Sequence, residues 1–184
     1  SISITVLVNP ISIALLPRFT ALYSGGGKDE AIKLFNKVNL FVAIIVFSIM
    51  AIIIFFPKEL IWIWTGKMEL AERTQIYLPI TAMSYAMLSL QIIPYNIAIA
   101  NAYTKSNNYL GIISLFITIP GYWLATKQYG AIGAACVFCI AQTIITLVYV
   151  FIIGRKFLER NGLSTIYLKQ IFLPILISIC VVWI

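Results

Sequence analysis

The side chains in this sequence that could do chemistry are mostly neutral and polar, with one arginine beside them. The 184 residues include no histidine, and no Asp or Glu lies within the long apolar stretches. General acid–base pairs, metal clusters and Ser-His-Asp triads therefore lack the residues they need. We expect no catalytic site, no metal site and no cofactor, so the chain is predicted not to be an enzyme.

Residues 76–102 carry the densest set of polar side chains. At helical spacing one face holds Thr81, Ser84, Gln91 and Tyr95, and a second stripe a third of a turn away holds Tyr85, Ser89, Asn96 and Tyr103. The opposite face, predicted to contact lipid, holds Pro79, Met83, Leu90 and Ile97. Polar groups in hydrocarbon need partners, which either neighbouring helices or a water-filled translocation cavity can supply. Both interpretations stay open for this segment.

Two further candidates lie elsewhere in the chain. Gln142 falls at helical spacing with Cys139, Thr146 and Tyr149, where helix packing competes with a cavity role. Arg18 directly follows Pro17 at the end of an apolar run. Its guanidinium either sets topology among lipid headgroups or binds a phosphate in bidentate fashion.

The elements that must position these residues are membrane helices. The charge-free windows are 1–17, 38–57, 74–104, 106–126, 128–154 and 170–184. Spanning a bilayer takes roughly 20 apolar residues. The sequence predicts an all-α, polytopic bundle of about six helices, over 2–22, 38–56, 76–102, 109–126, 131–153 and from residue 171 onward. We expect one transmembrane domain over 1–184, with its first and last helices cut by the chain ends and no signal peptide.

The connections between these helices differ in charge. Those at 18–37, 103–109 and 154–170 carry nine Lys and Arg residues, and those at 57–75 and 127–131 carry four. The positive-inside rule therefore predicts that the first group is cytoplasmic. Trp62 and Trp64, in a segment too short to span, suit the opposite headgroup boundary. The net charge of +7 is explained by these loops, so no nucleic-acid partner is expected.

Small residues in 128–154 have two possible roles. Cys136 and Cys139 form a CxxC spacing, but it lies inside a predicted span without a redox-type context, which favours helix packing. Gly130 and Ala134 form a small-xxx-small pair, which also predicts close packing.

Three runs resemble the multidrug/oligosaccharidyl-lipid/polysaccharide exporter superfamily. LLPRFTALYSGGGKDEAIKLF is similar to the end of the eighth helix of that superfamily, IPYNIAIANAYTKSNN to the tenth helix, and KQYGAIGAACVFCIAQTI to the entry into the twelfth. The order and spacing fit nearly the whole chain, and the likeness is greatest to the O-antigen/polysaccharide flippase branch. The resemblance implies a fold of about twelve to fourteen helices in total, arranged as two bundles around a cationic cavity. This chain would form most of the C-terminal bundle.

The function implied by the resemblance is transport of an undecaprenyl-pyrophosphate-linked oligosaccharide across the bacterial inner membrane by alternating access. The implied partners are the lipid-linked oligosaccharide, membrane lipids and polysaccharide polymerase machinery. The alternatives are a cation-coupled multidrug exporter or a lipid II flippase of the same superfamily, and, in a third class, a structural membrane subunit. The candidate cavity residues are Arg18, Ser84, Gln91, Tyr95, Asn96 and Gln142.

Overall fold

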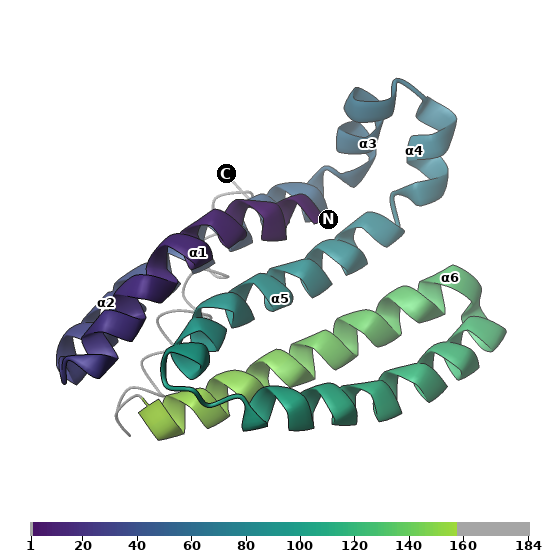
Figure 1. Cartoon of the computed structure of the whole chain (residues 1–184). Coiled ribbons are helices and arrows are strands. Elements are labelled where there is room, and N and C mark those ends of the chain that lie inside the picture. Colours follow the sequence, from purple (N-terminus) through teal and green to yellow (C-terminus); the bar gives the residue numbers. More distant parts are fainter. Residues whose placement is uncertain (1, 158–184) are drawn as a thin grey trace.

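The computed structural model describes residues 2–157, which fold entirely into helices and short connections (Figure 1). The helices are α1 (Ile2–Ser24), α2 (Lys28–Phe55), α3 (Pro57–Thr65), α4 (Met68–Thr74), α5 (Tyr77–Ala100) and α6 (Lys105–Phe157). Of these, α1, α2, α5 and α6 are long and apolar enough to cross a membrane. The prediction of an all-α membrane bundle is confirmed. The helix expected from residue 171 onward lies outside the described residues.

Helices α1 and α2 form an antiparallel pair joined by a three-glycine turn. The turn is closed by backbone hydrogen bonds from Gly25 to Ala21 (3.0 Å) and from Gly27 to Leu22 (2.9 Å). The stretch 28–37 was expected to belong to the connection before a helix over 38–56, but it is the first part of α2. The reason is its apolar side, because Ala31 and Phe35 are fully buried and extend the packed face of the span.

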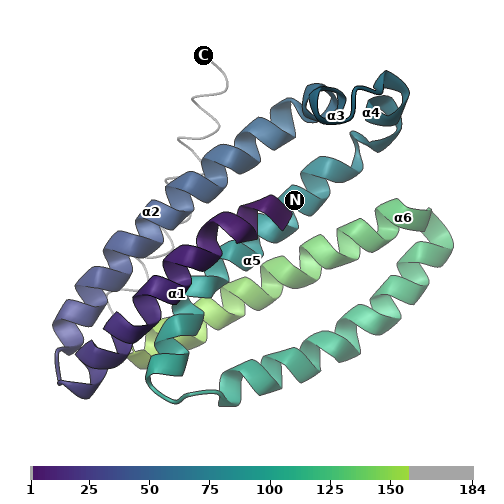
Figure 2. The same ribbon diagram turned by 45° about the horizontal axis from the view of Figure 1, so that its top comes forward.

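The connection 57–75, expected as a loop with one short segment, contains two short helices at one end of the bundle (Figure 2). Pro57 occupies the first turn of α3, where its missing N–H costs nothing. The region contains two ion pairs, Lys58–Glu72 (3.0 Å) and Arg73–Glu69 (2.8 Å). Trp64 is 89% exposed, which suits an aromatic side chain at a headgroup boundary.

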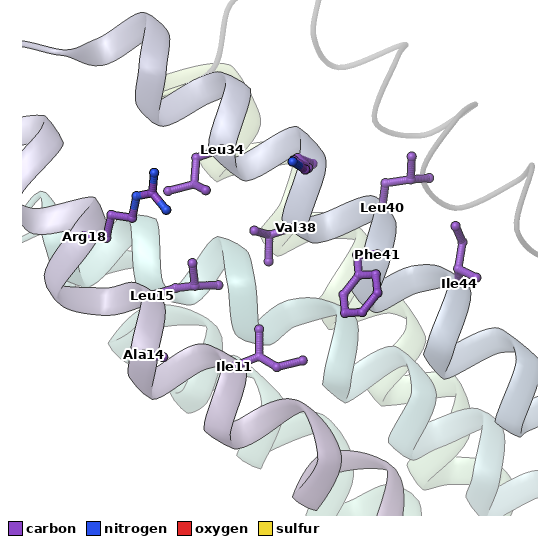
Figure 3. Close-up of a pocket in the computed structure, with 10 residues that line it drawn as sticks. Ile11, Ala14, Leu15, Arg18, Leu34, Val38, Leu40, Phe41 and Ile44 are labelled. Carbon is purple, nitrogen blue, oxygen red and sulfur yellow. The ribbon is translucent and has the colours of Figure 1, made fainter.

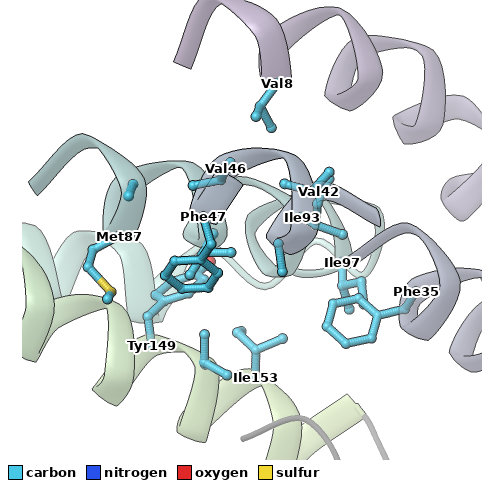
Figure 4. Close-up of a cluster of buried hydrophobic side chains, with 14 of the residues drawn as sticks. Val8, Phe35, Val42, Val46, Phe47, Met87, Ile93, Ile97, Tyr149 and Ile153 are labelled. Atoms are coloured by element: carbon cyan, nitrogen blue, oxygen red, sulfur yellow. The ribbon is translucent and has the colours of Figure 1, made fainter. Parts of the chain in front are cut away.

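Helix α5 lies at the centre and contacts α1, α2 and α6. The buried apolar cluster draws on all four long helices, and its labelled members in Figure 4 are Val8, Phe35, Val42, Val46, Phe47, Met87, Ile93, Ile97, Tyr149 and Ile153. The prediction that Leu90 and Ile97 face lipid is therefore wrong, because their exposures are 2% and 0%. A helix surrounded by three others buries its apolar face against them.

Helix α6 is a hairpin of two arms, 105–129 and 131–157, that reverses direction at Gly130 (Figure 1). Gly130 has φ 61° and ψ −142°, a region that is open essentially to glycine alone. The predicted spans 109–126 and 131–153 correspond to these arms. The small-xxx-small interpretation of Gly130 is wrong, since Gly130 makes the turn. The close approach is at Gly133, where an added Cβ would overlap the backbone oxygen of Ala125.

The basic connections gather at one end of the bundle. The α1–α2 turn, the α5–α6 connection and the end of α6 lie together, and α3, α4 and the Gly130 reversal lie at the opposite end (Figures 1 and 2). Lys156 stacks on the ring of Tyr103 at 3.3 Å from its centroid, which joins the second and third of these segments. The three segments predicted to be cytoplasmic thus share one end as far as residue 157.

Replacing Gly133 by alanine is expected to destabilise the α6 hairpin by about 1–3 kcal/mol, because the new methyl group meets backbone that no rotamer change can move. Thermal unfolding of the purified protein in detergent measures this loss. Gly111→Ala is the matched control, because nothing lies within 4 Å of its added Cβ. An equal effect of the two substitutions on the unfolding temperature would contradict close contact between the arms.

Candidate functional site

A polar pocket of about 270 Å³ lies between α5 and the two arms of α6. Helix α5 contributes Leu88, Gln91 and Tyr95 to its wall. The first arm of α6 contributes Asn107, Leu110, Gly111 and Ser114, and the second arm contributes Gln142, Ile145 and Tyr149. Its polar side chains are all neutral and include amides, hydroxyls and phenols. Such groups can hold a hydroxyl-rich or otherwise polar neutral ligand.

One side of the pocket is closed by hydrogen bonds between helices. Gln142 Nε2 donates to Gln91 Oε1 (3.2 Å) and to Thr146 Oγ1 (3.3 Å). The Thr146 hydroxyl lies 3.1 Å from the backbone oxygen of Met87, to which it donates, and 3.4 Å from Gln91 Oε1. Thr146 is fully buried, so these bonds satisfy polar groups that would otherwise be unpaired in an apolar setting. They join α5 to the second arm of α6.

The other side of the pocket contains buried polar atoms without a hydrogen bond. Tyr149 is fully buried; its ring packs in the apolar cluster, and its side chain also lines the pocket. The Asn107 side chain lies close enough to act as a hydrogen-bond partner of its hydroxyl, and Tyr95 is close enough to act on it electrostatically. Even so, neither the Tyr149 hydroxyl nor Asn107 Oδ1 has a hydrogen bond of ordinary geometry within residues 2–157. Leaving a buried polar atom unpaired costs about 1–3 kcal/mol, and a polar ligand removes that cost.

The structure brings together three of the six predicted cavity residues, Gln91, Tyr95 and Gln142. Asn96 lies elsewhere and binds α1, where its Nδ2 donates to the backbone oxygen (3.0 Å) and hydroxyl (2.9 Å) of Ser12. Ser84 is fully buried and donates to the Ile80 backbone oxygen (2.9 Å) within its own helix. For these two residues the helix-packing interpretation fits.

Arg18 does not reach this pocket. It lines a separate, largely apolar groove between α1 and α2 (Figure 3). The prediction that Arg18 contacts a phosphate stays a prediction, and its setting is the α1–α2 groove rather than the wall formed by α5 and α6.

Sequence reasoning missed Asn107 and Ser114, and it noted Tyr149 without placing it in the cavity. Asn107, Gly111 and Ser114 follow one another at i, i+4 and i+7, which puts them on one face of the first α6 arm. That stripe is the signal that could have identified this wall. The stripe was not recognised because the predicted helix began at residue 109 and so left out Asn107, whereas α6 begins at Lys105.

A bundle of apolar helices of spanning length around a neutral polar pocket defines a multi-pass membrane protein. A family model described as MatE matches residues 1–124, more than half of the chain, and the chain belongs to this family. The MatE family places it among the transporters of the multidrug/oligosaccharidyl-lipid/polysaccharide exporter superfamily, which are not enzymes. No curated protein and no solved structure gives a significant match to the chain.

Alanine substitutions of Ser12 and Asn96 are expected to be energetically coupled. In membrane bundles such interhelical hydrogen bonds contribute about 0.6 kcal/mol, with a maximum of about 1.7 kcal/mol. A double-mutant cycle on the free energy of unfolding in detergent measures the coupling. Ser12→Ala combined with Ser84→Ala is the control, since Ser84 donates only within α5. Identical coupling in the two cycles would rule out the α1–α5 bond as a stabilising contact.

Proposed function

We propose that this chain is part of a flippase that moves an undecaprenyl-pyrophosphate-linked oligosaccharide from the cytoplasmic to the periplasmic leaflet of the bacterial inner membrane. The observation that carries the proposal is the pocket between α5 and the α6 arms, whose polar side chains are neutral and include two buried atoms without a hydrogen bond of ordinary geometry in the described residues. The chain's membership of a transporter family supports the class of activity. Polysaccharide polymerase machinery is the proposed downstream partner.

The chemistry of the pocket suits a sugar. A sugar hydroxyl both donates and accepts hydrogen bonds, and the amides of Gln91, Gln142 and Asn107 offer both functions. The Tyr149 hydroxyl and Asn107 Oδ1 supply a donor and an acceptor that lie near each other and make no hydrogen bond of ordinary geometry in the described residues. The phenol rings of Tyr95 and Tyr149 add apolar surface with a polar tip. A ligand rich in hydroxyl groups uses all of these features together.

The pocket also suits transport by alternating access. Its walls come from α5 and from the α6 hairpin, and these two units can separate or close as rigid elements. The Gln91–Gln142 hydrogen bond crosses the junction of α5 with the second arm of α6. A sugar hydroxyl can replace either partner of this bond, so sugar binding shifts the equilibrium toward the state in which the two helices lie further apart.

A cation-coupled drug exporter of the same superfamily needs different groups in its cavity. A cationic drug is best stabilised by a carboxylate, and the segments 77–100 and 105–157 contain no Asp or Glu. The neutral lining of the pocket therefore favours the oligosaccharide over a cationic drug as the substrate.

Replacing Asn107 by alanine is expected to lower export roughly tenfold, the effect of losing about one good hydrogen bond. The readout is surface polysaccharide together with lipid-linked repeat units that accumulate inside the cell. Asn108→Ala is the matched control, because the neighbouring Asn108 is exposed and does not line the pocket. Protein levels in the membrane, measured in parallel, separate export from insertion.

Three results would contradict the proposal. Deleting the gene could leave surface polysaccharide intact with no accumulated repeat unit. Deletion could instead abolish resistance to cationic dyes, which would indicate a drug exporter. Finally, Asn107→Ala and Gln91→Leu could both leave export unchanged, which would fit a structural subunit.

A further inference from the structure

The groove between α1 and α2 has an apolar wall with two cations in its lining. Its volume is about 690 Å³, within the usual range for ligand sites. One wall comes from α1 through Ile11, Ala14, Leu15 and Arg18, and the other from α2 through Leu34, Lys37, Val38, Leu40, Phe41 and Ile44. On each helix most of these residues recur at helical spacing, so the groove runs along both helices for roughly 10–15 Å at 1.5 Å per residue.

The two cations lie toward the same end of this groove. Because α1 and α2 are antiparallel and joined at residues 25–27, Arg18 on α1 comes level with the 34–37 stretch of α2. Figure 3 shows Arg18 at one end of the row of apolar side chains and Ile44 toward the other. Within residues 2–157, the ion pairs involve other residues, and neither Arg18 nor Lys37 contacts a carboxylate. Their charges are therefore available to an anion.

We propose that this groove binds an anionic glycerophospholipid of the surrounding membrane, with its phosphate between Arg18 and Lys37 and an acyl chain along Leu15, Val38 and Phe41. A basic pocket between transmembrane helices at the cytoplasmic face is a typical site for anionic headgroups. On α1 and α2, Arg18 and Lys37 lie toward the turn at 25–27, and that turn is at the end of the bundle where the basic connections gather. Each feature of the ligand thus matches one feature of the groove.

The shape of the groove distinguishes this lipid from a small anion. Phosphate alone would use only the two cations and leave the apolar wall uncovered. The rim residues Phe41 and Ile44 are 56% and 47% exposed, so the wall opens sideways to the hydrocarbon from which a lipid enters. The site shares no residue with the pocket between α5 and α6, and the proposal therefore does not depend on the transported substrate.

The test compares lipid binding to the purified full chain. Phosphatidylglycerol and phosphatidylcholine with identical acyl chains are titrated separately into the protein in detergent, and bound lipid is counted by native mass spectrometry. Phosphatidylglycerol is expected to bind more tightly. Neutralising each cation, as Arg18→Gln and Lys37→Gln, is expected to weaken phosphatidylglycerol binding roughly fivefold, and both together more than tenfold. Lys105→Gln, an exposed cation at the same end of the bundle, is the control and should change binding less than twofold.

A second variant tests the apolar half of the site. Ala14 is exposed in the groove wall, so Ala14→Phe fills the groove while both cations stay in place. It is expected to remove the preference for phosphatidylglycerol without changing the unfolding temperature in phosphatidylcholine. Retention of the full preference would overturn the proposal, because the anion would then bind outside the groove.

Two further outcomes would also overturn it. Equal binding of the two lipids to the wild-type protein would show that the cations do not select an anion. In a background with Cys136→Ser and Cys139→Ser, rapid disulfide formation between Ile44→Cys and Cys180 would show that the chain's own residues 171–184 cover the groove. A low yield of this cross-link, together with the lipid preference, supports the lipid as the occupant.

Discussion

The need to pair every polar group inside the protein governs this bundle, because hydrocarbon offers no water as a partner. Helices satisfy the backbone, and Ser84 and Thr143 donate to backbone oxygens one turn earlier in their own helices. Asn96 donates a hydrogen bond to Ser12 on α1, and Gln142 donates one to Gln91 on α5. The pocket between α5 and the α6 arms is one place in the described chain where this internal pairing is incomplete, since the Tyr149 hydroxyl and Asn107 Oδ1 make no hydrogen bond of ordinary geometry there.

The membrane spans could be predicted from sequence because charge is excluded from them. The windows 38–57 and 74–104 correspond closely to the apolar parts of α2 and α5. The pocket residues Gln91, Tyr95 and Gln142 were also predictable, since long polar side chains inside a span need a partner or a cavity. These predictions depend on composition and helical spacing, both of which a single sequence contains.

The features that could not be predicted from the sequence are the burial and the hydrogen-bond partners that depend on which helices become neighbours. Helical spacing placed Leu90 opposite the polar face of α5, but only the packing of α1, α2 and α6 around α5 buries it. Spacing likewise could not show that Ser84 bonds within its helix while Asn96 reaches α1. The charge count identified the connection at 57–75 but not its two helices. Their Lys58–Glu72 ion pair forms only when α3 and α4 fold against each other.

The reversal at Gly130 bears on how the protein is made. The first arm of α6 ends and the second begins with no loop between them, and Gly133 holds the arms in backbone contact beside the turn. We expect the pair to leave the insertion machinery together as a helical hairpin, so the pocket wall formed by both arms is assembled in a single biosynthetic event.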